Sequence, residues 1–292
     1  MVPVIFLHRG NDLVYPALTQ ARKFNERVIL LGDTTNNQHK SEFYPYLNYL
    51  DDRAERMVHA YRHMHKKPEG TVRYRLANIL RWFVISNYMR TANIDTAFIA
   101  DSDLLLYVNV EEVKDDWGGY DVLLGAPDYQ ESFRWAAPGH ASFWTLEMLD
   151  LFCEFAIEQY IVKPGLERLR AKWHWHLDTG ANGGVCDMTL LYLFSQRYSA
   201  LVGSLLEAVL DVQGGMHAFD LNINQAENFY KDEYRMRELK DAPYGAIKYL
   251  IWNDGIPYGD SPLQTALVRF DALHFQSGAK TLVPMALRNG EG

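Results

Sequence analysis

The chain has 292 residues, enough for one large domain or two small ones, and its composition of 48% hydrophobic and 23% charged residues is that of an ordinary globular protein. The net charge of −8 argues against a general nucleic-acid binder, which would present a basic face. The two cysteines, Cys153 and Cys186, cannot form a structural zinc site by themselves and are typical of free thiols in a reducing compartment.

The sequence carries no pattern for export or for membrane insertion. The first expected strand begins near residue 3 without a charged segment and a long apolar run before it. No stretch approaches the ~20 apolar residues of a membrane span. We therefore expect a cytoplasmic protein without a transmembrane span, and peripheral association with a membrane surface stays open. The absence of repeats, low-complexity tracts and Ser/Gly linkers favours a single domain over residues 1–292.

Apolar runs and helical spacing alternate in the first part of the chain. Residues 4–7 predict a short strand, a helix with Asn11 or Asp12 as its N-cap follows to about Phe24, and residues 28–31 predict the next strand. This βαβ unit predicts a largely parallel sheet, whose ligands bind beyond the carboxyl ends of its strands. The remaining expected elements are helices at residues 50–67, 74–89, 145–160 and 187–198, strands at 95–100, 120–124, 141–144 and 267–275, and loops at 34–49 and through much of 203–265.

Two aspartates follow a buried strand in the middle of the chain. The apolar residues 97–100 end in Asp101-Ser102-Asp103, and more apolar residues come next. Carboxylates are costly to desolvate, so this pair needs a cation, and hard oxygen ligands suit Mg²⁺ or Mn²⁺ bound together with phosphates. Alternate residues of a strand point to opposite sides, so both carboxylates reach one ion only if the chain turns sharply here. The plain alternative is a solvated strand end.

The longer segment around these aspartates carries a more specific pattern. Residues 101–113 run Asp-x-Asp, an apolar patch, Asn109, an aliphatic residue, two acids and an aliphatic residue. This order resembles the metal-site segment of GT-A glycosyltransferases, especially the glycogenin-like and bacterial galactosyltransferase-like retaining enzymes. The resemblance implies a GT-A type α/β fold, with a Rossmann-like, mostly parallel sheet flanked by helices and a C-terminal acceptor-side region. It also implies a UDP-sugar donor, with Mn²⁺ or Mg²⁺ bridging Asp101, Asp103 and the diphosphate.

A second match lies near the C-terminus. The family carries His-Phe-x-Gly-x-x-Lys, and His274, Phe275 and Lys280 keep its spacing, while Ser277 stands where the family has Gly. The resemblance implies that His274 is a further metal ligand and that Lys280 binds the diphosphate. This set is chemically consistent, because a neutral imidazole completes a metal shell and Lys supplies a point charge for phosphate.

A third match involves a glycine-rich turn at residues 178–191, which resembles the family's turn into Asp-Gln-x-Leu-Leu. The family's Asp lies by the sugar ring and the acceptor, which makes Asp187 the candidate catalytic residue, although Met188 replaces the usual Gln. Asp187 also stands where a helix N-cap would fall, so capping is a rival role. The expected acceptor contacts are Asn182 in this turn and the aromatic faces of Trp173 and Trp175, in a segment that alternates as a strand would.

Further donor contacts follow from the family's pattern. The family places a basic residue on the helix before the metal strand, and spacing does not choose between Arg75 and Arg81. In the family, the loop after the first strand holds the base and ribose of the donor. His8, Arg9, Asn11 and Asp33 are therefore expected donor contacts by their position alone. The expected donor-binding residues are His8, Arg9, Asn11, Asp33, Arg75, Arg81, Asp101, Ser102 and Lys280.

The expected reaction is sugar transfer from the nucleoside-diphosphate donor to the hydroxyl of a glycan or another acceptor. The metal and Lys280 would neutralise charge on the leaving diphosphate. The resemblance favours retention, but Asp187 as a general base for inversion stays open. Residues 1–115 are expected to bind the nucleotide sugar, and residues 116–292 to form the acceptor side with the C-terminal metal and phosphate loop.

Two alternatives belong to other classes. A haloacid-dehalogenase-like phosphohydrolase also carries Asp-x-Asp after a strand, but Leu105 replaces its usual Thr or Val and a complete βαβ unit precedes the motif here. A non-catalytic sugar-nucleotide-binding module would bind the donor without turnover, and the intact Asp101, Asp103, His274 and Lys280 argue against it.

Overall fold

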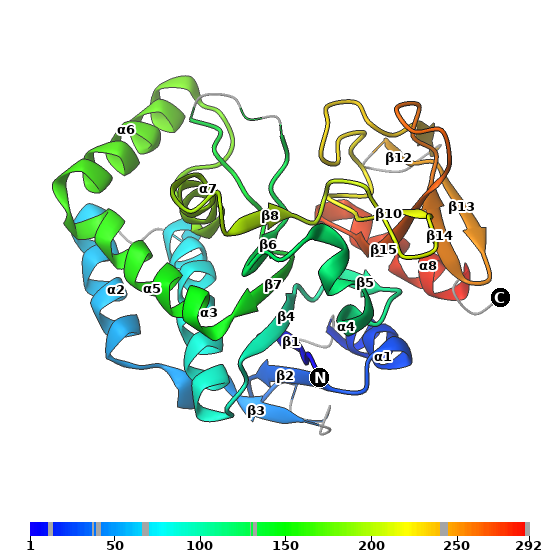
Figure 1. Ribbon diagram of the computed structural model, residues 1–292. Helices are drawn as coiled ribbons and strands as arrows, with labels where there is room; N and C mark the ends of the chain where they lie inside the picture. The colour runs from blue at the N-terminus through cyan, green and yellow to red at the C-terminus, as the bar shows by residue number, and fades with distance from the viewer. Residues whose placement is uncertain are drawn as a thin grey trace.

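The computed structural model describes residues 1–10, 14–36, 38, 42–65, 70–128, 130, 133–239 and 245–289. Its largest sheet contains β1 (Val4–Leu7), β2 (Val28–Gly32), β3 (Phe43–Pro45), β4 (Thr96–Ala100), β6 (Val122–Leu124), β7 (Ala141–Thr145) and β8 (Val202–Ser204). Their spatial order is β3-β2-β1-β4-β7-β6-β8 (Figure 1). Neighbouring strands are parallel except where β7 meets β4 and β6. The predicted α/β class with a mostly parallel sheet is confirmed.

Alternation of side chains lets this sheet bury residues on both faces. Val4 and Phe6 belong to one apolar cluster, while Ile5 between them belongs to another on the opposite face. Figure 1 shows helices on either side of the sheet, which flank it as predicted. The helices of the Ile5 side are α2 (Asp52–Met64), α3 (Gly70–Thr91), α5 (Leu146–Ile161), α6 (Lys163–Thr179) and α7 (Asp187–Arg197), and those of the other side are α1 (Tyr15–Phe24) and α4 (Val110–Val113).

A second sheet brings distant segments of the chain together. It contains β5 (Leu104–Leu106), β9 (Val209–Leu210), β10 (Met216–Phe219), β13 (Leu250–Asn253), β14 (Ile256–Gly259) and β15 (Val268–His274), and the short pair β11 (Met236–Glu238) and β12 (Ala246–Lys248) lies apart from it. Strand β5 pairs antiparallel with β15, and Leu104 stands opposite His274. The end of β15 therefore lies beside the turn that follows β4.

Two segments differ from the sequence-based expectation. Residues 34–49 were expected to be a loop, but they include β3, which adds an edge strand beside β2, and the short 3₁₀ helix η2 (Tyr46–Tyr49). The segment around Trp173 and Trp175 was expected to be a strand, and that prediction is wrong, because both residues lie in α6. The buried positions of α6 have helical spacing: Gly165, Leu169, Lys172 and His176.

The remaining expectations concern caps, thiols and membrane spans. The helix α1 begins at Tyr15 with Val14 as its N-cap, and the expected caps Asn11 and Asp12 lie outside the described residues. Cys153 and Cys186 are free thiols. Among the helices that the structure describes, none combines the length and apolar character needed to cross a membrane.

Candidate metal and donor site

The two aspartates lie on a sharp turn at the carboxyl end of β4. Asp101 follows β4 directly and Asp103 precedes β5, and the Leu104 N–H donates to the Asp101 carbonyl at 3.1 Å. The Asp101 N–H donates to the His140 carbonyl at 2.8 Å, because β7 runs antiparallel to β4 and begins where β4 ends. The chain therefore makes the turn that two carboxylates near one ion would require.

The end of β15 delivers an imidazole and an ammonium group to Asp103. The Phe275 N–H donates to the Asp103 carbonyl at 2.9 Å, which fixes the two backbones together. His274 Nε2 lies 3.5 Å from Asp103 Oδ1, and Lys280 Nζ lies 3.0 Å from Oδ2. Lys280 belongs to the 3₁₀ helix η4 (Ser277–Leu282). Burial alone would raise the pKa of Asp103, but His274 and Lys280 hold this pKa well below its ordinary value.

The orientation of His274 fits a cation beside Asp103. His274 Nδ1 lies 2.7 Å from the Leu221 carbonyl, an acceptor, so Nδ1 carries the proton of the neutral ring. The Nε2 lone pair then faces a carboxylate oxygen, and either a proton or a metal ion must lie between two such acceptors. Ligands of an ion with bonds near 2.1 Å lie about 3 Å apart, close to this separation. The nitrogen and oxygen donors suit a divalent ion such as Mn²⁺.

Arg81 links Asp101 to the start of α7. Its Nη1 lies 2.5 Å from Asp101 Oδ1 and its Nη2 lies 3.1 Å from Asp187 Oδ2. Burial raises the pKa of Asp101, and the Arg81 charge opposes this shift. Asp187 is the first residue of α7, Cys186 is the N-cap, and Trp82 Nε1 also donates to Asp187. The Asp187 side chain is therefore engaged in an ion pair with Arg81, and the N-cap position of α7 is held by Cys186.

Because the Asp101 side chain turns toward Arg81, the carboxylates of Asp101 and Asp103 do not both face a single metal position. Within the described ranges, no three His, Cys, Asp or Glu side chains form a complete metal-binding group. Asp103 and His274 are the two donors that face each other. A metal ion here would therefore need further ligands from a substrate, from water or from a shifted Asp101.

These residues line a pocket of about 440 Å³. Its wall includes Arg81, Asp101, Asp103, Asp187, His274 and Lys280 together with Arg75. Arg75 donates to the Gly183 carbonyl and lies over the Trp173 ring at 5.3 Å. The structure thus separates the two candidate arginines, since Arg81 contacts Asp101 and Asp187, whereas Arg75 contacts the glycine-rich turn.

Several expected site residues lie elsewhere. His8, Arg9 and Asp33 follow β1 and β2 at the same edge of the sheet, but they do not line this pocket. Asp33 accepts hydrogen bonds from Gly10 and Thr35. Asn11 lies outside the described residues.

The expected acceptor residues also lie outside the pocket wall. Trp173 packs against His65, Trp175 stacks with Phe133, and Asn182 is exposed in the turn after α6. Ser102 lies in the turn between the aspartates without lining the pocket.

Sequence reasoning missed His140, which precedes β7. Its ring lies parallel to the His274 ring with centroids 4.1 Å apart, and its Nε2 donates to the Asp220 carbonyl at 2.9 Å. Burial lowers the pKa of His140 well below its ordinary value, so the ring is neutral. Its sequence signal was weak, because a single histidine before a short strand has no spacing to distinguish it.

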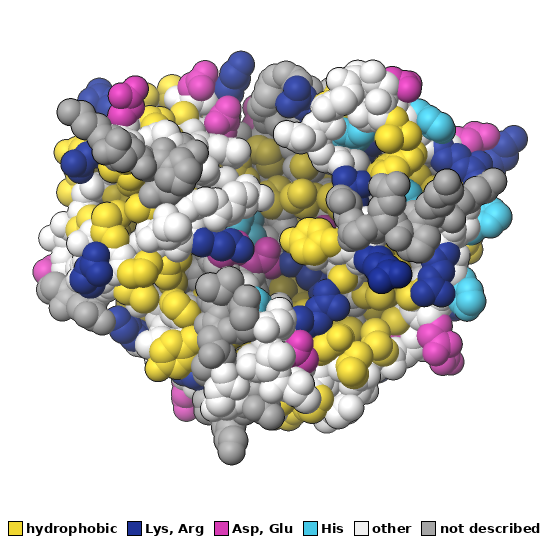
Figure 2. All heavy atoms as spheres, turned by 180° about the vertical axis from the view of Figure 1, so that it is seen from behind, with side chains coloured by type: hydrophobic (Ala, Val, Ile, Leu, Met, Phe, Trp, Pro, Cys, Tyr) yellow, Lys and Arg dark blue, Asp and Glu magenta, His cyan; other side chains and the backbone are white. Residues whose placement is uncertain are grey.

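Figure 2 shows one face of the molecule. On it, Lys and Arg side chains alternate with Asp and Glu side chains, and basic, acidic and histidine side chains lie close together near the centre. A continuous basic surface does not appear on this face among the described residues.

Comparisons with known proteins give similarity at the level of structure alone. No family model matches the chain, and no curated protein matches it significantly. The structure is similar to mouse xyloside xylosyltransferase 1, with 13% identity, a TM-score of 0.45, and coverage of 70% of this chain and 84% of that chain. It is also similar to the galactosyltransferase LgtC, with 12% identity, a TM-score of 0.41, and coverage of 70% of this chain and 73% of that chain. A third similar structure is the bifunctional glycosyltransferase WbbM, with 13% identity, a TM-score of 0.39, and coverage of 70% of this chain and 38% of that chain. Identities this low leave the activity to be argued from the site itself.

Proposed function

We propose that this chain is a metal-dependent glycosyltransferase. Its donor would be a nucleoside-diphosphate sugar, with UDP as the expected nucleotide, and its acceptor a hydroxyl group of a glycan or another molecule. The observation that carries the proposal is the position of Asp103, whose two carboxylate oxygens face His274 and Lys280 at the carboxyl edge of the sheet. Ligands of such sheets bind at this edge.

Asp103 and His274 are the proposed ligands of Mn²⁺ or Mg²⁺, and Asp101 is the proposed third. The described side chains do not complete a metal shell, which is expected when diphosphate oxygens supply the missing ligands. A bound divalent cation would neutralise charge on the leaving diphosphate. Lys280 is suited to the same task, because its side chain is 45% exposed and can turn from Asp103 to a phosphate oxygen.

The environment of Asp187 favours retention over inversion. Its Oδ2 faces both Arg81 and Trp82, and the residue is only 3% exposed. A general base must be within hydrogen-bond reach of the acceptor hydroxyl and free to take its proton. A carboxylate held by an arginine is better suited to fixing the arginine and the sugar than to proton transfer. Retention, in which a donor phosphate oxygen takes the proton, agrees with this arrangement.

Binding of UDP in the presence and absence of Mn²⁺ tests the donor and metal assignments. We expect calorimetry to show metal-dependent binding that Asp103→Ala or His274→Ala abolishes. The matched control is Asp121→Ala, an exposed aspartate that precedes β6 at the opposite edge of the sheet. Equal affinity of the wild type and Asp103→Ala would exclude the proposed metal site.

Turnover separates the proposal from its two alternatives. The protein is incubated with a panel of nucleotide sugars, Mn²⁺ and a set of sugar acceptors, and free nucleoside diphosphate is measured. Release of nucleoside diphosphate supports the transferase. Inorganic phosphate from simple phosphate esters would instead identify a phosphohydrolase, and metal-dependent binding without release across the acceptors would identify a binding module.

A further inference from the structure

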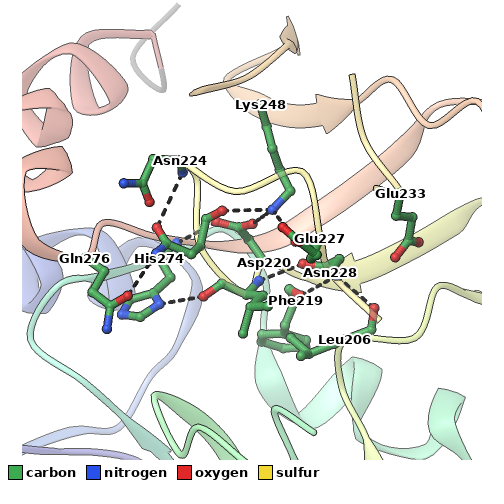
Figure 3. Close-up of polar contacts among 12 residues, drawn as sticks. Leu206, Phe219, Asp220, Asn224, Glu227, Asn228, Glu233, Lys248, His274 and Gln276 are labelled. Carbon is green, nitrogen blue, oxygen red and sulfur yellow. Dashed lines mark hydrogen bonds and ion pairs between the residues drawn. The ribbon is translucent and has the colours of Figure 1, made fainter. Parts of the chain in front are cut away.

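A lysine and an aspartate form a fully buried ion pair behind the candidate site. Lys248 Nζ lies 2.7 Å from Asp220 Oδ1, and both side chains are 0% exposed. The same ammonium group donates to the carbonyls of Asn222 at 2.8 Å and Glu227 at 3.0 Å. All three protons of the lysine therefore have partners. Figure 3 shows Lys248 extending from β12 toward Asp220 and Glu227.

The other half of Asp220 is connected to His274. Asp220 Oδ2 accepts the backbone N–H of His274 at 3.1 Å, and the carbonyl of the next residue, Leu221, accepts the His274 Nδ1–H at 2.7 Å. The Asp220 carbonyl holds the neighbouring His140 ring at 2.9 Å. Residues 220 and 221 thus fix both the backbone and the ring of His274.

We propose that Lys248 and Asp220 are positioning residues for His274. The ion pair fixes the chain at residues 220–222, and this chain holds the His274 ring with Nδ1 protonated and Nε2 directed at Asp103. The inference rests on the proposed function, in which His274 is a metal ligand. Residues that orient a ligating histidine through its second ring nitrogen affect metal affinity strongly.

The geometry favours this role over a general role in stability. A buried ion pair is costly to desolvate and stabilises a fold little compared with apolar residues of similar volume. Lys248 donates to two carbonyls besides Asp220, and one of these, Asn222, is adjacent to the Leu221 carbonyl that holds the ring. The Asn222 side chain also bonds Gln276, two residues after His274. The pair therefore lies at the centre of the contacts that surround His274.

The test variant is Asp220→Asn, which keeps the shape of the side chain. Its single carbonyl oxygen cannot accept from both Lys248 and the His274 N–H, because the amide NH₂ then faces one of these donors. We expect the dissociation constant for Mn²⁺, measured from the free-ion EPR signal, to rise about 10- to 100-fold. In the metal-free protein, ¹⁵N–¹H spectra at a pH where the ring is neutral should show the Nδ1–H tautomer in wild type and its loss in the variant.

Asp271→Asn is the matched control. Asp271 is equally buried, lies on β15 with His274, and pairs with His217 at 2.6 Å and Arg269 at 2.9 Å. We expect its Mn²⁺ affinity to stay within about twofold of wild type. The double variant Asp220→Asn/Lys248→Met frees the amide oxygen for the His274 N–H and should recover part of the lost affinity.

Each outcome decides the proposal. Wild-type Mn²⁺ affinity in Asp220→Asn, or an equal loss in Asp271→Asn, would overturn it. A wild-type His274 ring without a fixed Nδ1–H tautomer would also overturn it, whatever the metal affinity. A third outcome is a protein that binds no Mn²⁺, either alone or with UDP, and whose fixed ring loses its tautomer in Asp220→Asn. This outcome would contradict the proposed function and uphold the positioning of the ring.

Discussion

Arg81 and Asp101 form an ion pair at the end of β4, with Nη1 2.5 Å from Oδ1. The second nitrogen of the same guanidinium reaches Asp187, so Arg81 separates two carboxylates inside the pocket. Two adjacent carboxylates without a cation between them repel each other at close range. Arg81 therefore neutralises part of the negative charge in the pocket. On the proposed function, Asp101 would be shared between Arg81 and the metal ion.

The first prediction concerns Arg81→Lys. A lysine carries a point charge and lacks the planar fork that reaches Asp101 and Asp187 together. We expect the affinity for UDP with Mn²⁺ to fall about tenfold, because at least one charged hydrogen bond is lost. Calorimetry measures this loss. Arg73→Lys on the exposed face of the same helix is the control and should bind as wild type. Unchanged affinity in Arg81→Lys would remove Arg81 from the donor site.

The second prediction concerns Ser277, which stands where the resembled family has glycine. Ser277 has φ +55°, so a residue with a Cβ occupies the left-handed region that glycine adopts without strain. We expect Ser277→Gly to raise the free energy of unfolding by about 0.5–1 kcal/mol, since relief of strain exceeds the added entropy of the unfolded chain. Urea denaturation measures the change.

Ser199→Gly is the control for Ser277→Gly. Ser199 is exposed and is not among the described residues with positive φ, so its replacement by glycine should leave stability unchanged or lower it. A loss of stability of the same size in both variants would show that Ser277 carries no strain.

The sequence predicted well those elements whose burial is periodic or continuous. The runs at residues 4–7, 28–31 and 97–100 are apolar because a parallel sheet covered on both faces buries almost all of their side chains. The helix α6 was misread because Trp-His-Trp-His has a period of two in sequence, while its buried residues repeat at helical spacing. The edge strand β3 has no buried residue and gave no pattern.

The residues of the candidate site also differ in whether a sequence pattern marks them. Asp101, Asp103, His274 and Lys280 carry a pattern of residue types and spacings, and the structure brings them together. Asp220 carries no such pattern, because its contact with His274 is a hydrogen bond to a backbone N–H, and it lies in a region without hydrophobic periodicity. Helical spacing likewise could not distinguish Arg75 from Arg81 on α3. The distinction depends on where Asp101 and Asp187 lie in the folded structure.

The third prediction concerns the pH dependence of stability at His65. The residue is 7% exposed, its ring packs between Tyr61 and Trp173, and burial followed by the Arg75 charge lowers its pKa to about 4. Tyr160 of α5 also faces the ring. Between pH 6.5 and 4 the unfolded chain binds a proton that the folded chain does not. Stability should therefore fall as pH falls through this window, by up to about 3 kcal/mol from this group.

His65→Gln tests this prediction, because glutamine does not titrate. The free energy of unfolding should decrease less between pH 7 and pH 4 in His65→Gln than in the wild type. His59→Gln, on the exposed face of α2, the helix whose C-cap is His65, should follow the wild-type curve. Parallel curves for all three proteins would show that His65 is protonated equally in the folded and unfolded states.

The fourth prediction uses two glycines to isolate Arg75. A Cβ at Gly184 would lie 2.6 Å from Arg75 Nη1, whereas a Cβ at Gly180 would meet no atom within 4 Å, and both residues have positive φ. Alanine at either position should cost about 1 kcal/mol of backbone strain, measured by urea denaturation. Only Gly184→Ala should also displace the flexible Arg75 side chain and weaken the binding of UDP with Mn²⁺. If both variants bind UDP equally well, Arg75 has no part in donor binding, and its contact with the glycine-rich turn is structural.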